Sequence, residues 1–140
     1  MILILVLLNF MKKEHHNIKV SVQSIYLEEH SEPSESSFLW AYQVKIENKS
    51  KDTVKLISRY WKIIDANGTT KEVEGEGVVG EQPVLAPGES FEYTSGTPLH
   101  TSSGLMHGSY FMKNIDGPNF EVKIPAFSLD IPNSEKIINH

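Results

Sequence analysis

The sequence predicts a small all-β sandwich, and three observations lead to this prediction. The chain has 140 residues, a common size for one domain with one hydrophobic core. Its 39% hydrophobic and 22% charged residues are typical of a folded globular protein. Runs that alternate apolar and polar residues recur between turn signals, whereas no helical period persists in the body of the chain.

The first expected strand covers residues 18–29, where Val20 and Val22 alternate with polar neighbours. The second, residues 38–47, has the clearest alternation of the whole chain. Its even-numbered apolar residues share one face and are Phe38, Trp40, Tyr42, Val44 and Ile46. A strand that is half-buried in a sandwich needs this pattern, so we expect Trp40 to fill the core.

Residues 54–64 form the third expected strand. Its apolar residues fall on both faces, which predicts a central strand that accommodates a bulge. Asn67 and Gly68 follow it and predict a hairpin. The turn that matches strand twist needs positive φ angles, and both residue types tolerate them.

The remaining strands are separated by proline and glycine signals. Pro87 and Gly88 predict a type II turn before a strand at 90–95. Strands at 109–115 and 119–124 are expected next, with Phe127 and Leu129 continuing the sheet edge after Pro125. About seven or eight short strands at this spacing predict an antiparallel sandwich, and a closed barrel is the alternative.

Both ends of the chain fall outside the expected domain, which we place at residues 18–132. We interpret residues 1–17 as a leader, either disordered or the product of a mis-assigned start, and 133–140 as a polar tail. The apolar run 1–8 is shorter than the ~20 residues that span a membrane. It also has no preceding basic segment, unlike a secretory signal. We therefore expect no membrane insertion.

Composition narrows the function classes. A formal net charge of -5 argues against a nucleic-acid partner, because such binding depends on clustered lysine and arginine. No cysteine is present, which excludes a disulfide, a zinc-thiolate site and a thiol nucleophile, and fits a cytoplasmic location. No G-x-S-x-G motif surrounds the serines, so we expect no catalytic residue and no enzyme.

Gly75, Gly77 and Gly80 satisfy the pattern G-x-G-x-x-G of dinucleotide-binding folds. That mechanism needs a helix directly after the motif, whose amides hold the pyrophosphate. Pro83 and Pro87 leave no room for one. We therefore interpret the glycines as a bulge or a tight loop between strands, while a loop whose backbone amides bind an anion stays open.

Histidines and aromatic residues supply the other candidates. The six histidines are dispersed along the chain, so we expect no metal site and no cofactor. Trp61 is a candidate for either the core or a recognition patch, because Arg59 two residues away could stack on an aromatic face.

Four segments read together resemble the bacterial ApaG family. They are Ser58-Arg59-Tyr60-Trp61, Asp65-Ala66-Asn67-Gly68, residues 73–83 and residues 85–96. Tyr26-Leu27-Glu28-Glu29 and the strand that begins Phe-Leu-Trp-Ala-Tyr also fit, so the resemblance covers about 18–132. One departure is Tyr60, where the family carries a histidine.

The resemblance implies a fibronectin type III-like or immunoglobulin-like sandwich and an association with cobalt resistance and magnesium efflux. Related eukaryotic domains look like protein-binding modules. We therefore expect a non-enzymatic interaction module, linked to Co²⁺ and Mg²⁺ only indirectly, with an unknown protein partner and a possible homodimer through a sheet edge. The alternative is a binding protein for a nucleotide, pyrophosphate or its metal complex. Candidate contact residues are Gly75, Glu76, Gly77, Gly80, Arg59 and Trp61.

Overall fold

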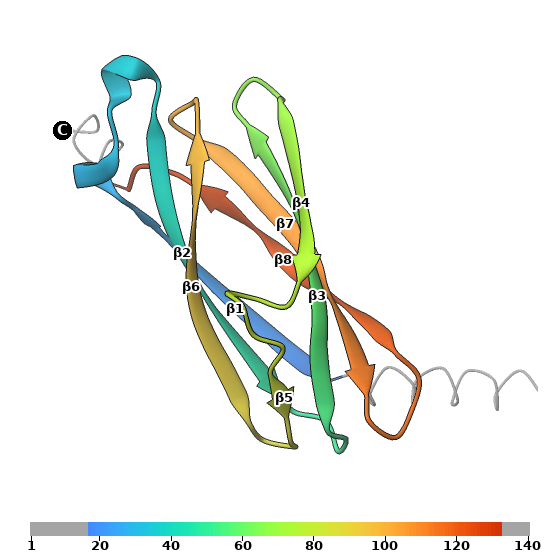
Figure 1. Ribbon diagram of the computed structural model, residues 1–140. Coiled ribbons are helices and arrows are strands. Elements are labelled where there is room, and N and C mark those ends of the chain that lie inside the picture. The colour runs from blue at the N-terminus through green and yellow to red at the C-terminus, as the bar shows by residue number, and fades with distance from the viewer. Residues whose placement is uncertain (1–16, 133–140) are drawn as a thin grey trace, which may run out of the picture.

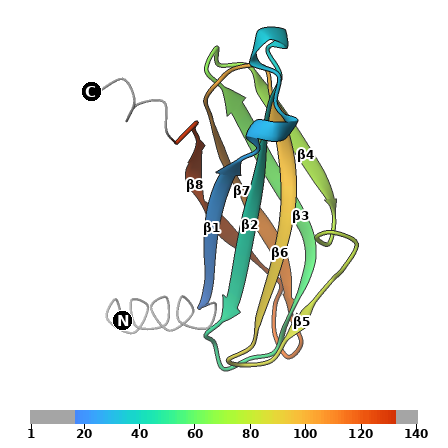
Figure 2. The ribbon, with the colours of Figure 1, turned by 90° about the vertical axis from the view of Figure 1, so that its left-hand side faces the viewer.

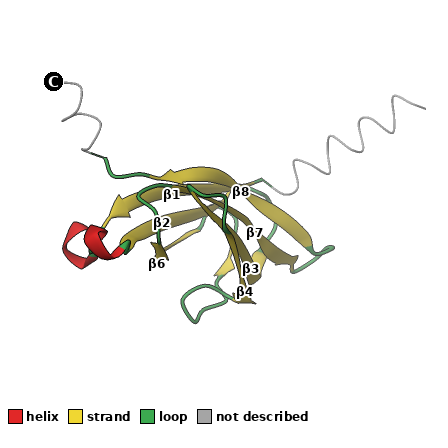
Figure 3. Ribbon diagram, turned by 90° about the horizontal axis from the view of Figure 1, so that it is seen from above, coloured by secondary structure: helices red, strands yellow, loops and turns green. Residues whose placement is uncertain are grey.

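The computed structural model describes residues 17–132 as two antiparallel sheets packed face to face (Figure 1). The three-stranded sheet has the order β1 (Ile18–Tyr26), β2 (Phe38–Asn48), β6 (Ser90–Leu99). The five-stranded sheet has the order β4 (Thr70–Glu76), β3 (Val54–Asp65), β7 (Gly104–Asn114), β8 (Phe120–Leu129), and β5 (Val84–Leu85) also pairs with β3. Viewed from above, the strands form two layers (Figure 3). The predicted fibronectin type III-like sandwich is confirmed, and the barrel alternative is wrong.

The two sheets come closest at one edge, where β1 lies beside β8 (Figure 2). The Ser24 hydroxyl donates to the Ser128 carbonyl there, at 3.0 Å. Along β2 the predicted alternation is confirmed, and Trp40 is fully buried. Its ring packs 5.2 Å from that of Tyr26 on β1.

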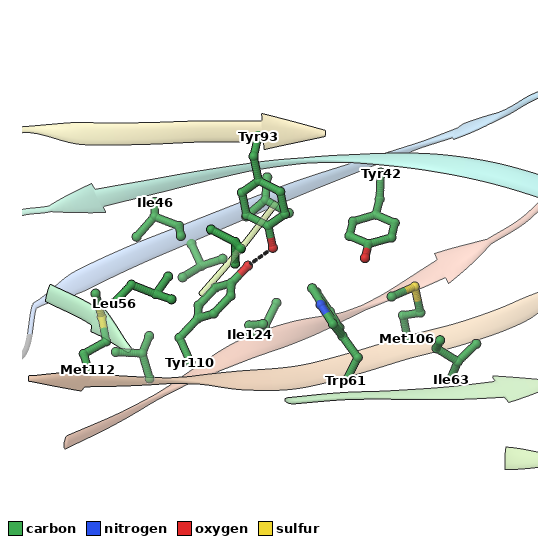
Figure 4. Packing of buried hydrophobic residues seen from close by; sticks show 14 of the residues in the cluster. Tyr42, Ile46, Leu56, Trp61, Ile63, Tyr93, Met106, Tyr110, Met112 and Ile124 are labelled. Atoms are coloured by element: carbon green, nitrogen blue, oxygen red, sulfur yellow. Dashed lines mark hydrogen bonds between the residues drawn. The ribbon is translucent and has the colours of Figure 1, made fainter. Parts of the chain in front are cut away.

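The core between the sheets is rich in aromatic rings (Figure 4). Trp61 is 2% exposed, and its ring lies 5.3 Å from Tyr42 and 5.9 Å from Phe127. The hydroxyls of Tyr93 and Tyr110, from opposite sheets, form a hydrogen bond. Burial raises the pKa of both tyrosines, so both hydroxyls stay neutral and the bond joins the two layers.

The predicted central, bulged strand is confirmed in β3, which lies between β4 and β7. Leu56 pairs with Met112 and Ser58 with Phe111, so Ile57 is the extra residue of a β-bulge. A bulge changes which residues face inward. Leu56 before it and Trp61 after it therefore both reach the core, although an odd number of steps separates them.

Two turns were predicted, and one of them differs in detail. The type II turn is confirmed, since Gly88 has a φ of 86° and the Glu89 amide donates to the Ala86 carbonyl at 3.0 Å. In the β3–β4 hairpin only Gly68 has a positive φ, at 81°, so the loop is not the expected turn with positive φ at both residues. Asp65 Oδ1 accepts the Asn67 amide at 2.8 Å and so favours a type I turn.

Three expected strand boundaries were wrong. β1 ends at Tyr26 rather than at residue 29, because short 3₁₀ turns cover Glu28–His30 and Pro33–Glu35. β6 continues to Leu99 and β7 begins at Gly104. Pro98 fits because β6 is an edge strand, where a missing amide proton can face away from the ladder.

A buried amide joins the loops at one end of the sandwich. Asn48 is 1% exposed, and its Nδ2 donates to the carbonyls of Asp52 at 2.8 Å and Leu85 at 2.9 Å. Its Oδ1 accepts the Ser50 amide at 3.0 Å and the Ser50 hydroxyl at 2.6 Å. One side chain thus holds the β2–β3 loop against β5.

The interpretations of the two chain ends lie outside the described residues, except at Asn17, whose carbonyl accepts the Lys49 amide at 2.9 Å. Between residues 17 and 132, no helix has the length and apolar character needed to cross a bilayer.

Candidate functional site

Arg59 and Gly75 form the centre of the candidate site. They are paired across β3 and β4, and a Cβ built on Gly75 would lie 2.8 Å from Arg59 Nη1. The absence of a side chain at Gly75 lets the arginine cross the strand. Its Nη1 donates to the carbonyls of Glu76 at 3.0 Å and Gly77 at 2.9 Å. Arg59 therefore braces the start of the loop that follows β4.

The loop itself is a tight two-residue turn. Val78 and Glu81 exchange both backbone hydrogen bonds, at 2.8 and 2.9 Å, around Val79 and Gly80. Val79 has a φ of 44° and Gly80 of 81°, which are the positive angles of a type I′ turn. The interpretation of the glycine motif as tight β-loop geometry agrees with this turn.

The β-bulge in β3 holds the base of the loop through two hydrogen bonds. The Ile57 carbonyl accepts the Gly77 amide at 2.8 Å and Gln82 Nε2 at 2.9 Å. Val78 is fully buried, whereas its neighbour Val79 is 53% exposed. The loop is thus fixed at its base and presents one apolar side chain at its tip.

Little of the loop's backbone is free for an anion. The amides of Gly77, Val78 and Glu81 all donate within the protein. Gly77 is buried, and a Cβ on it would lie 2.3 Å from the Glu81 carbonyl. Because carboxylates at positions 76 and 81 flank the turn, its surroundings disfavour a phosphate.

The structure brings five of the six candidate residues together. Gly75, Glu76, Gly77, Gly80 and Arg59 lie in or beside the loop. Trp61 does not, because it points into the core between Tyr42 and Tyr110 (Figure 4). Its ring also contacts that of Phe127. Of the two alternatives for Trp61, the structure shows the core, and Arg59 makes carbonyl hydrogen bonds.

Tyr60, the departure from the family pattern, lies on the outer face of the five-stranded sheet. Its hydroxyl donates to Glu72 Oε2 at 2.9 Å. This hydrogen bond raises the pKa of Tyr60, because it favours the protonated phenol. Among the described residues, no group of three or more histidine, aspartate or glutamate side chains is placed to hold a metal ion.

Sequence reasoning missed Ile57, Val79 and Gln82. Ile57 and Gln82 are joined by a hydrogen bond at the β-bulge. Their positions depend on how the strands pair, which the local sequence does not indicate. The position of Val79 in a turn could have been predicted from the segment Val78-Val79-Gly80-Glu81, because Gly80 lies where a two-residue hairpin turn needs a glycine.

Replacing Arg59 with methionine should loosen the loop, because two hydrogen bonds from a charged donor are lost. Hydrogen exchange at the Gly77 amide should speed up about tenfold, while strand amides in the core keep their protection. The Arg59→Lys variant, which keeps the charge, should show a smaller effect. Equal exchange in all three proteins would contradict the bracing role.

The fold and the loop together define a β-sandwich domain with an arginine-braced turn on its five-stranded sheet. The ApaG domain profile matches residues 28–114. Protein ApaG of Brucella canis is 57% identical over 122 residues, which are 87% of this chain and 94% of that protein. Protein ApaG of Parvibaculum lavamentivorans is 55% identical over 123 residues, which are 88% and 95%. The chain belongs to the ApaG family.

Two solved structures are also similar to this chain in both fold and sequence. A crystal structure described as the ApaA protein from Bordetella pertussis has a TM-score of 0.82 and 46% identity, over 84% of this chain and 96% of that one. A second X-ray structure from a structural genomics programme has a TM-score of 0.78 and 42% identity, over 84% and 88%.

Proposed function

We propose that this chain is a non-enzymatic protein-interaction module and that the turn around Val79 contacts its partner. Val79 carries the proposal, since it has a φ of 44° and is 53% exposed. A β-branched residue in this region costs about 1–3 kcal/mol and persists only where the surroundings enforce it, commonly at binding sites. An isolated structural turn would be more stable with asparagine there.

The rest of the loop supports the proposal. Arg59, Gln82 and the buried Val78 hold the turn, so Val79 is presented with little conformational freedom to lose on binding. Val84, on β5 after the turn, is also 53% exposed. The segment from β4 to β5 thus offers two apolar side chains on a rigid scaffold, where recognition residues are commonly found.

Replacing Val79 with asparagine should separate stability from function. The variant should be about 1 kcal/mol more stable, because asparagine tolerates positive φ, and its melting temperature should rise. Tagged wild-type protein should recover a defined partner from cell extract, identified by mass spectrometry, and V79N should recover much less of it.

Ile115→Asn is the matched control, because Ile115 is 50% exposed and lies outside the loop. It should recover the partner as the wild-type protein does. A V79N variant that gains no stability, or that recovers the partner in full, would count against the proposal.

The alternative from the sequence, a nucleotide or pyrophosphate site at the glycine loop, has less support because most of the loop amides are already bonded. In our proposal the association of the family with cobalt and magnesium acts through the protein partner. The chain itself then needs no ligand set for either cation.

A further inference from the structure

A shallow groove of ≈ 470 Å³ lies on the outer face of the five-stranded sheet, over the paired strands β3 and β7. Ser58 pairs with Phe111, and Tyr60 pairs with Ser109. Each strand thus contributes one serine and one aromatic residue, and each serine lies opposite a ring. The small serine side chains leave a hollow between the rings of Tyr60 and Phe111. Phe111 is 44% exposed, so its ring is available to a partner.

Carboxylates border this groove on both sides. Glu74 and Glu76 lie on β4, opposite Tyr60 and Ser58, and Glu121 lies on β8, opposite Phe111. All three are exposed. The one cation among the lining residues is Arg59, whose guanidinium already bonds two backbone carbonyls. Among the lining residues the groove therefore combines aromatic walls with three carboxylates against one cation, while Lys123 on β8 lies at its border, opposite Ser109.

We propose that this groove binds an arginine side chain from a basic segment of the partner protein. A planar guanidinium stacks on aromatic rings and donates to carboxylates in a fork geometry. Tyr60 and Phe111 supply the rings, and the three glutamates supply acceptors. This inference rests on the proposed interaction function and names the chemistry of the partner.

A second copy of this chain does not fit as the occupant. Arg59 is the only arginine in the 140 residues, and its guanidinium is bonded to its own loop. The occupant is therefore a different protein. A lysine is a poorer match, because an ammonium is a compact, strongly hydrated charge that cannot stack as a plane.

The test is a titration of the ¹⁵N-labelled full chain with three short peptides. The peptides differ only at two positions, which are both arginine in the first, both lysine in the second and both citrulline in the third. Citrulline keeps the planar shape of arginine and lacks its charge. The arginine peptide should shift the amide signals of strands β3, β4 and β7 around Ser58 and Ser109. The lysine and citrulline peptides should bind at least about tenfold more weakly, a difference of ~1.4 kcal/mol.

The variant E74Q/E76Q/E121Q should weaken the arginine peptide about tenfold, and F111A should weaken it as well. The control E28Q/E29Q/E92Q removes equal charge from exposed positions away from the groove and should leave binding unchanged. Thermal melting verifies that each variant is folded.

Three results would overturn the groove assignment: signal shifts that map elsewhere, equal weakening by both triple variants, or citrulline or lysine peptides that bind as tightly as arginine. A partner that depends on Val79 but binds the groove variants normally would remove this inference alone. If the Val79 experiment fails but the arginine peptide binds saturably at the groove, only the proposed contact of the loop with the partner is disproved.

Discussion

Replacing Asn48 with alanine is expected to lower the free energy of unfolding by about 3–5 kcal/mol, since it removes four hydrogen bonds of a buried side chain. The Leu85 carbonyl loses its side-chain donor and the Ser50 amide loses its acceptor. The Asp52 carbonyl and the Ser50 hydroxyl each lose one bond and keep the 3.2 Å hydrogen bond between them. The loop between β2 and β3 would then separate from β5. Urea denaturation of the purified variant measures the loss.

Asn119→Ala is the control for this change, because Asn119 is exposed. It should stay within about 0.5 kcal/mol of the wild-type protein. An Asn48→Ala protein as stable as this control would mean that water replaces the lost hydrogen bonds at no cost.

Gly108→Ala should have an effect of similar or larger size. A Cβ at this position would lie 2.0 Å from the Tyr60 carbonyl oxygen and 3.0 Å from its carbon. Both atoms belong to the backbone of β3, so no side-chain rotation relieves the clash and β7 must move away. We expect at least about 3 kcal/mol of destabilisation, seen as low soluble yield or a large fall in the denaturation midpoint.

The comparison for this variant is Gly117→Ala. There the atoms nearest to a Cβ belong to the Asn114 side chain, at 3.3 Å, and Gly117 itself is exposed in a turn. Its stability should change much less. If Gly108→Ala is as stable as Gly117→Ala, β7 can move away from β3 at little cost in free energy, and the predicted clash does not limit stability.

The sequence predicted the sandwich because its main signal is local. Alternation in β2 follows directly from burial on one face, and the apolar residues on both sides of β3 follow from its central place. Turn residues such as Gly88 also act within four residues, so their role could be predicted from neighbours alone.

Strand lengths were less predictable where glycine and proline lie within a strand. Gly96 and Pro98 disfavour strand by local propensity, yet β6 continues through both because pairing with β2 outweighs it. Gly104 and Gly108 likewise occur inside β7, where close contacts with the paired β3 backbone require them.

The candidate site was predicted only in part. The glycine motif identified the loop, whereas Arg59 was a candidate only through its nearness to Trp61, and its position against the loop follows from the pairing of β3 with β4. The serines and rings of the outer groove could not be assigned to one place, because their neighbourhood depends on the register between β3 and β7. One residue of difference in that register changes every pair.

The bulge at Ile57 also bears on how this chain tolerates insertions and deletions. Removing one residue between Leu56 and Ser58 would bring the two halves of β3 into a single alternation. Four steps would then separate Leu56 from Trp61, so both would still face the core and Ser58 would stay on the outer face. What the deletion removes is the Ile57 carbonyl, which accepts the Gly77 amide and Gln82 Nε2. The extra residue therefore serves the surface loop and not the core: its deletion should leave the sandwich folded, while the turn around Val79 loses its hydrogen bonds to the bulge.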